Sequence, residues 1–182
     1  SSGYRSRWED TFKKYLIQMT KVAKRARKQL IWAGDLNVNP TRADWSTRAF
    51  DRIRHKIPRD VKPAGCREED QERYREMIRE MDGVNVAERF NKESQRTCFP
   101  DEHHLERNFG QRIDHIIAER TLFDGTSPIQ IESYDVLQQF GGGRRGGSDH
   151  CPMLIKLQRA STKQPENSSK SEAQSLDGTT LQ

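Results

Sequence analysis

The chain has 182 residues, 32% of them hydrophobic and 32% charged, and carries a formal net charge of +5. A chain of this length accommodates one domain. No apolar stretch approaches the roughly 20 residues of a membrane-spanning helix, and no signal-peptide pattern opens the sequence. The composition therefore excludes a membrane-spanning protein. We expect a soluble intracellular protein whose modest positive excess suits either a nucleic-acid partner or simple solubility.

Helical and strand patterns alternate along the chain. Residues 8–28 have apolar side chains at helical spacing, acidic residues in the first turn and basic residues in the last, which predicts an amphipathic helix. The apolar run 30–33 predicts a buried strand, so Asp35 and Asn37 lie just past its end. In the irregular segment that follows, Trp45, Phe50 and Ile53 are expected on the core. The next expected elements are a helix over 67–83, a strand over 84–90, a long surface loop over 96–110 and a strand over 111–119.

The last part of the chain adds two strands and a tail. Residues 128–137 alternate like a strand, and residues 152–157 form a short apolar run that predicts a buried strand. From Gln158 onward the sequence is rich in Ser, Gln and Lys and predicts disorder. We therefore expect one layered α/β domain of about five strands over residues 1–157, followed by a disordered tail over 158–182.

Three cysteines and two adjacent histidines form no metal-ligand pattern of their own. Cys66, Cys98 and Cys151 are odd in number and widely spaced, so we expect reduced thiols that serve packing. His103 and His104 stand in a charged stretch without a third ligand in view, and we expect them to be solvated.

Three polar sets stand at the ends of predicted strands. Taken singly, each has a structural explanation: GDLN suits a turn, RID suits a structural ion pair, and SDH suits an Asx turn. A carboxylate inside an apolar strand is costly unless it is paired, and an imidazole is its natural partner. The sets are Asp35 with Asn37, Arg112 with Asp114, and Asp149 with His150.

Together these sets predict metal-assisted phosphodiester hydrolysis. Asp114 would hold His150, which would donate to a phosphate as charge builds on it, while Asp35 would orient or deprotonate an attacking water. Asn37 would hydrogen-bond a phosphate oxygen or a metal-bound water. The catalytic set is thus Asp35, Asn37, Asp114 and His150. The predicted metal site for Mg²⁺, with Mn²⁺ as the alternative, comprises Asp35, Asn37, Asp149 and His150. Basic side chains near the site are expected to contact substrate; they are Arg112, Arg144 and Arg145.

Three ordered motifs, WAGDLNVNP, GQRIDHIIA and GGSDHCPM, resemble the C-terminal half of the exonuclease-endonuclease-phosphatase superfamily. Within it, the chain is most similar to the exonuclease III-like class II apurinic/apyrimidinic (AP) endonucleases. The resemblance spans about Tyr4–Leu157. It implies the C-terminal half of a four-layered, DNase I-like α/β sandwich. It also implies Mg²⁺-dependent hydrolysis of double-stranded DNA with abasic or 3′-blocked ends in base-excision repair.

Two departures qualify this resemblance. The family's N-terminal half, with its metal-binding Glu and its Tyr-containing loop, is absent, so we expect either a fragment of a longer protein or an inactive chain. Thr97-Cys98-Phe99 and NFGQRID are more similar to the type-2 branch, whose activity leans toward 3′-to-5′ exonuclease and 3′-phosphodiesterase work and whose C-terminal extension contacts the sliding clamp. We expect a monomer in the nucleus, with mitochondria as the alternative.

Other interpretations share the same motifs. A retrotransposon endonuclease module contains all three. Lipid- or inositol-phosphate phosphatases and sphingomyelinases share GDxN and SDH but usually depart in the helix after GDLN. A catalytically inactive DNA-binding remnant fits the missing Glu.

Overall fold

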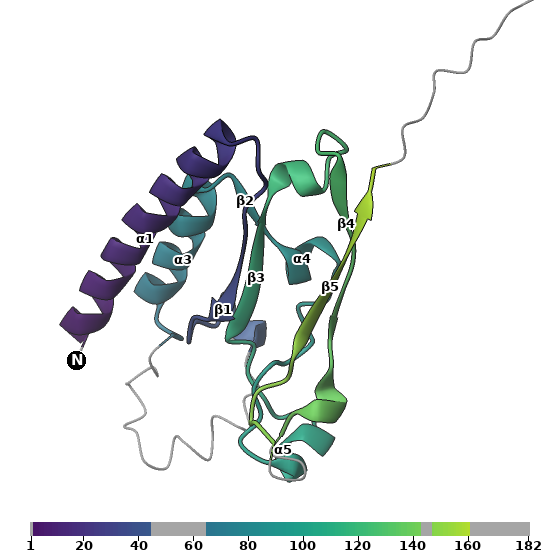
Figure 1. The fold of residues 1–182 in the computed structure, drawn as a ribbon. Coiled ribbons are helices and arrows are strands. Elements are labelled where there is room, and N and C mark those ends of the chain that lie inside the picture. Colours follow the sequence, from purple (N-terminus) through teal and green to yellow (C-terminus); the bar gives the residue numbers. More distant parts are fainter. Residues whose placement is uncertain (1, 45–64, 143–146, 161–182) are drawn as a thin grey trace, which may run out of the picture.

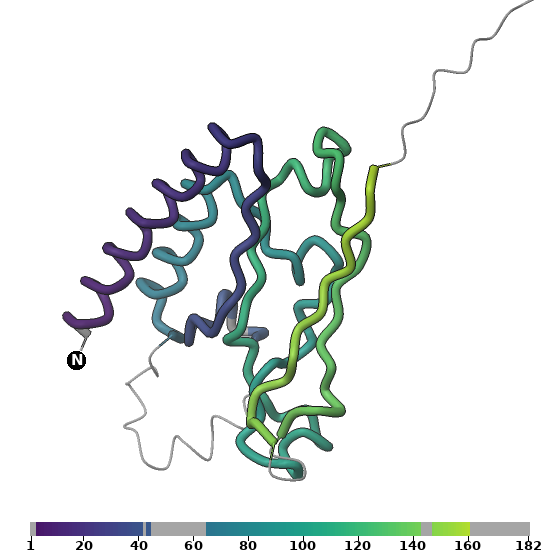
Figure 2. Tube along the Cα trace, viewed as in Figure 1, coloured from purple at the N-terminus to yellow at the C-terminus, as the bar shows by residue number. Residues whose placement is uncertain are grey.

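Three layers make up the computed structural model, which describes residues 2–44, 65–142 and 147–160 (Figure 1). Helices α1 (Ser2–Arg25) and α3 (Glu68–Glu80) lie side by side on one face of a three-stranded sheet. The sheet has the order β1-β3-β2. A two-stranded sheet covers its other face. The tube in Figure 2 shows the start of α1 and the end of β5 at opposite corners of the molecule.

All strand pairs in the described residues are antiparallel. The strands are β1 (Ile31–Asp35), β2 (Gly83–Asn85), β3 (Asp114–Glu119), β4 (Ile129–Val136) and β5 (Met153–Arg159). Two short helices, α4 (Val86–Arg89) and α5 (Glu102–Glu106), and three short 3-10 turns complete the described elements. The expected number of strands is therefore confirmed.

Strand β3 divides the core in two because successive side chains of a strand point to opposite faces. Ile116 and Ala118 pack into a cluster between the two sheets, together with Phe99, Leu122 and Tyr134. Ile117 packs on the other face, in the cluster under the two helices with, among others, Leu16, Tyr74 and Met77. Every residue of β3 is buried, including the polar Asp114, His115 and Glu119, because both faces of the strand are covered.

The first helix differs from its predicted form. It begins at Ser2, six residues earlier than expected, and its first turn has no acidic residue. Leu16 is buried, but Trp8, Tyr15 and Val22 from the predicted core face are exposed. Periodicity located the helix correctly but could not show which side of it meets the sheet.

Two sequence predictions are partly wrong. They are the strand expected over 84–90 and the surface loop expected over 96–110. The strand stops at Asn85, because the Asn85 side chain accepts hydrogen bonds from the first turn of α4 and caps that helix. The expected loop contains α5 and a fully buried Phe99, and His104 is buried against Asp101, which caps α5. The prediction that both histidines are solvated thus fails for His104.

The last strand is longer and more exposed than predicted. β5 runs to Arg159, two residues past the expected domain end at residue 157. Leu154 and Leu157 are about half exposed, because among the described strands β5 pairs with β4 alone, and the described residues leave one face of this sheet uncovered. Three parts of the prediction lie outside the described residues. They are the core positions Trp45, Phe50 and Ile53, the arginine pair of the glycine loop, and the tail beyond residue 160. None of the described helices is long and apolar enough to cross a membrane.

Candidate active site

The end of β1 and the start of β3 meet at one end of the three-stranded sheet, and the start of β5 lies beside them (Figure 1). β1 runs antiparallel to β3, and the register pairs Asp35 with Asp114 directly. His150, just before β5, reaches the same place from the second sheet. Residues separated by up to 115 positions thus meet because strand ends converge there.

Asp114 holds the imidazole of His150. The His150 Nδ1 atom lies 2.9 Å and 3.1 Å from the two carboxylate oxygens of Asp114. Burial alone would lower the pKa of His150, but the hydrogen bond to Asp114 and three neighbouring carboxylate charges outweigh it, so this pKa lies above its usual value. The predicted Asp114–His150 pairing is therefore present in the structure. Because Asp114 holds Nδ1, the other ring nitrogen, Nε2, is available to a ligand.

Asp35 and Asn37 form a tight local unit. The Asn37 backbone N–H donates to Asp35 Oδ1 at 2.8 Å, and its side-chain amide donates to Oδ2 at 3.1 Å. Asn37 adopts a positive φ of 50°, which asparagine tolerates better than most residues. The turn expected for GDLN therefore exists, and it directs both side chains to the exposed end of β1.

The loop after β1 is fixed by contacts from three other elements. From α1, the Arg5 guanidinium donates to the carbonyls of Leu36 and Asn37, each at 3.0 Å. From β3, His115 Nε2 lies 2.8 Å from the Val38 carbonyl. On α3, the Gln71 side chain donates to the Asn39 carbonyl at 2.9 Å. Sequence reasoning missed Arg5, because nothing local distinguishes it from the other arginines of the helix.

A short extended segment, Thr97–Phe99, joins the two halves of the site. The Thr97 and Cys98 N–H groups donate to the Gln111 carbonyl, the Phe99 N–H donates to the Asp149 carbonyl, and the Cys151 N–H donates to the Thr97 carbonyl. The buried Thr97 hydroxyl accepts hydrogen bonds from the backbone of Ile113 and Asp114, at 3.2 Å and 3.1 Å. Thr97 therefore positions the start of β3. Its only signal in the sequence is the TCF motif that precedes RID.

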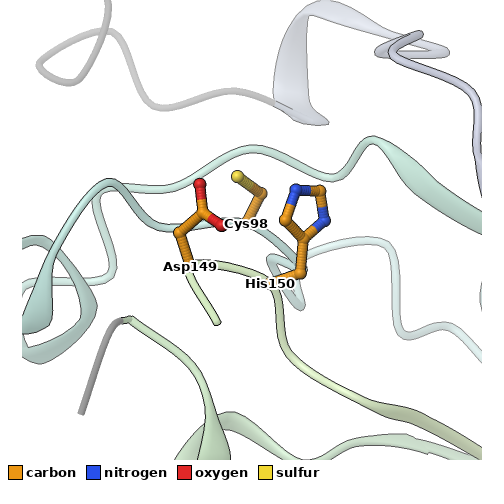
Figure 3. A group of neighbouring side chains, drawn as sticks. All are labelled: Cys98, Asp149 and His150. Atoms are coloured by element: carbon orange, nitrogen blue, oxygen red, sulfur yellow. The ribbon is translucent and has the colours of Figure 1, made fainter. Parts of the chain in front are cut away.

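Cys98 lies inside the site, although it was predicted to serve packing. Its thiol, the Asp149 carboxylate and His150 form a group whose ligand atoms lie within 4.8 Å of one another (Figure 3). Burial, together with three nearby carboxylates, raises the pKa of the Cys98 thiol to about 12. Cys66 and Cys151 are buried, as expected for packing residues.

A second group with metal-ligand geometry comprises Asp35, Asp114 and His150, again within 4.8 Å. Of the four predicted metal ligands, Asp149 lies in the first group, Asp35 in the second and His150 in both, whereas Asn37 contacts the site through Asp35. The exposed Asp35 and Asp149 carboxylates are hard oxygen donors of the kind that Mg²⁺ prefers. The donor set therefore fits this ion. An open hollow of about 560 Å³ lies next to Asp35 and Asn37, between the first turns of α1 and α3.

Arg112 does not face the site, so the prediction that it contacts substrate is wrong. Its side chain is 1% exposed and pairs with the fully buried Asp44, with Nε 2.6 Å from Oδ1. In the structure Arg112 therefore forms a structural ion pair, which is the alternative considered for the RID motif. Arg144 and Arg145 lie outside the described residues, so their predicted DNA contact stays a prediction.

No family model matches the chain, but individual proteins do. The chain is 25% identical over 175 residues to a DNA-(apurinic or apyrimidinic site) endonuclease of Plasmodium berghei, covering 85% of the chain and 31% of the relative. It superimposes on an AP endonuclease from Leishmania major with a TM-score of 0.59 and 20% identity, covering 84% of the chain and 43% of that structure. For a 3′-5′ exonuclease from Neisseria meningitidis the TM-score is 0.64 at 16% identity, and coverage is 85% and 53%.

The fold is therefore that of the DNase I-like nucleases, as the motifs implied. The chain resembles AP endonucleases in sequence, and in structure it resembles an AP endonuclease and a 3′-5′ exonuclease, which confirms the resemblance. It spans about a third of the length of the curated relative and about half of the two solved structures.

Proposed function

We propose that this chain is the C-terminal half of a DNA-repair nuclease that hydrolyses the phosphodiester bond 5′ to an abasic site and trims blocked 3′ ends in duplex DNA. The observation that carries the proposal is the hydrogen-bonded Asp114–His150 pair within 4.8 Å of the Asp35 carboxylate. An imidazole held by one carboxylate, beside a second carboxylate that is exposed, can supply a general acid and a general base to the same bond.

Each side chain has a distinct role in this hydrolysis. His150, oriented by Asp114, donates a hydrogen bond to the phosphate as negative charge builds on it. Asp35 orients the attacking water and accepts its proton. An amide nitrogen carries two hydrogens, so the Asn37 hydrogen that is not directed to Asp35 can donate to a phosphate oxygen.

Mg²⁺, or Mn²⁺ in its place, would be held by Asp35, Asn37 and Asp149. His150, the fourth predicted ligand, would bind the ion only when its free nitrogen does not donate to the phosphate, because Asp114 holds the other nitrogen. When bound, the ion supplies positive charge that stabilises the transition state at the phosphate. In the described residues, neither ligand group contains a glutamate. We propose that the N-terminal half of the protein supplies the Glu that the resemblance implies. The missing ligand also favours a second candidate, a DNA-binding fragment that is inactive by itself.

The finer assignments rest on the sequence. The Thr97-Cys98-Phe99 motif supports the type-2 branch, with its weight on 3′-end trimming and a C-terminal extension that binds the sliding clamp. A monomer acting in the nucleus, with mitochondria as the alternative, completes the proposal.

An incision assay on duplex DNA with one abasic analogue tests the proposed function. It uses the 182-residue chain and a version extended upstream, each with Mg²⁺ and with a chelator. We expect Mg²⁺-dependent incision by the extended protein and much less by the chain alone. In the extended protein, His150→Ala should lower the rate roughly 100- to 10,000-fold, and Asp114→Ala about 10- to 100-fold.

The double variant Asp114→Ala/His150→Ala separates a coupled pair from two independent groups. Because Asp114 acts through the histidine, the double variant should be little slower than His150→Ala. His103→Ala, on the surface of α5, is the control for loss of a histidine. Near-normal incision by His150→Ala, or multiplied losses in the double variant, would contradict the assigned roles.

A further inference from the structure

Cys98 places a sulfur donor at a centre otherwise made of oxygen and nitrogen donors. Figure 3 shows the Cys98 sulfur, the Asp149 carboxylate and one ring nitrogen of His150 on the same side of the backbone. These residues come from two segments that pair at Cys98 and His150 through an isolated antiparallel bridge. Backbone pairing therefore helps to hold the sulfur, oxygen and nitrogen donors close together, in addition to the conformations of their side chains.

The geometry suits a small tetrahedral ion. Ligand atoms on one zinc ion lie about 3.3 to 3.8 Å apart, given bonds of about 2.0 to 2.3 Å. The three ligand atoms here lie within 4.8 Å of one another, so a shift of about 1 Å or less per atom closes the site. Asp149 is exposed, and its side chain has room for such a shift.

The chemistry of the donors selects the kind of ion. Mg²⁺ prefers oxygen ligands, whereas thiolate and imidazole favour zinc and its softer congener cadmium. His150 is suited to this role because Asp114 holds Nδ1 at 2.9 Å, which leaves Nε2 for a ligand and raises its basicity. Three protein donors with an open fourth position are a common zinc environment.

We propose that Cys98, Asp149 and His150 form a binding site for a thiophilic divalent cation, Zn²⁺ or Cd²⁺, and that its occupation blocks the hydrolytic centre. On binding, the Cys98 S–H bond breaks, a metal–sulfur bond forms and the thiol proton is released to solvent, with no change in oxidation state. A His150 ring that is protonated also releases its Nε2 proton to solvent as that nitrogen binds the ion. The ion takes the Asp149 carboxylate and the free nitrogen of His150, so neither remains available to the phosphate. The blocking half of this inference rests on the proposed function; the binding half does not.

The binding half is tested without any nuclease assay. Cd²⁺ is titrated into the 182-residue chain while the ultraviolet charge-transfer absorption of a cadmium–thiolate bond is recorded. We expect the band to saturate at one equivalent, to be absent in Cys98→Ser and Cys98→Ala, and to persist in Cys66→Ser, which removes a thiol outside the site. Circular dichroism of each variant verifies folding. A band of unchanged size in both Cys98 variants would overturn the proposal, as would its loss in Cys66→Ser.

The blocking half is tested on the extended protein. Zn²⁺ is added to the Mg²⁺-supported incision reaction, and each variant is compared with its own rate without Zn²⁺. We expect Cys98→Ser to need at least about tenfold more Zn²⁺ for half inhibition, since one of three protein ligands is lost. Equal sensitivity of both proteins would refute blocking through Cys98. Absence of any Mg²⁺-supported incision would instead count against the proposed function and leave the absorption result intact.

Discussion

Two histidines of this region have opposite electrostatic surroundings. His150 is held by Asp114 and its pKa is raised. His115 is buried, and burial together with the Arg112 charge lowers its pKa to about 4. The neutral ring fits its neighbours, because Nε2–H can donate to the Val38 carbonyl while Nδ1 faces the Asn85 amide at 3.4 Å. His115 therefore supports the loop after β1 in its uncharged form.

His115 should make the protein less stable in acid. Between pH 6.5 and about 4 the unfolded chain binds a proton at this residue that the folded chain does not. The free energy of unfolding therefore falls as the pH falls through this window, by up to about 1.4 kcal/mol per pH unit from His115 alone. His115→Gln, which cannot titrate, should show a shallower slope in urea denaturation over this range. His103→Gln controls for the substitution; the same change of slope in that variant would rule out burial as the cause.

At the scale of elements, the loop after β1 is held by close backbone approach as well as by hydrogen bonds. Gly65, just before α3, donates its N–H to Asp70 and accepts from the Asn39 N–H. It has a φ of +80°, and a Cβ built there would lie 1.8 Å from the Asn37 carbonyl oxygen. Only glycine fits both conditions at this position.

Gly65→Ala and Gly125→Ala separate backbone strain from steric clash. Both glycines have a φ near +80°, but Gly125 has no atom within 4 Å of a built Cβ. Gly125→Ala should cost about 1 to 2 kcal/mol of stability, from strain alone. Gly65→Ala should cost clearly more and should also slow incision, because the new methyl group displaces Asn37. Urea denaturation measures both costs, and equal values would show that the contact with Asn37 is unimportant.

At the scale of the whole molecule, apolar side chains remain on the outside of two layers. Trp8, Tyr15 and Val22 are exposed on α1, and Leu154 and Leu157 are exposed on β5. Such surfaces are typical of protein that contacts further protein. The chain spans about half of two structures with its fold. These observations agree with the proposal that an N-terminal half completes the sandwich.

The positive charge of the molecule leads to a prediction about DNA binding. Arg144→Ala/Arg145→Ala should weaken binding to duplex DNA and reduce the slope of log affinity against log salt by about two, if both side chains contact phosphates. Fluorescence anisotropy at several salt concentrations measures this slope. Arg75→Ala/Arg79→Ala is the matched control, because these arginines carry the same charge and pair with Glu72 on the surface of α3. An equal effect of both changes would assign the slope to net charge instead of to the glycine loop.

Local patterns in the sequence were sufficient to predict most helices and strands and most of the candidate site residues. Periodicity located both long helices, and apolar or alternating segments located the strands, although the strand expected over 84–90 ends at Asn85. The motifs that end or precede strands predicted Asp35, Asn37, Asp114 and His150 as site residues, and the structure places these four side chains close together. The pairing of Asp114 with His150 could be argued from the cost of an isolated carboxylate inside an apolar strand.

Only the tertiary structure decided how these residues meet. The antiparallel register sets Asp35 opposite Asp114. The pairing of Thr97–Phe99 with two distant segments brings Cys98 to the site, and a buried Asp44 withdraws Arg112 from it. Strand register and ion pairs between distant segments depend on the whole set of packed elements, which no local spacing contains. The sequence by itself thus determined which chemical groups stand at strand ends, and the fold decided which of them share one site.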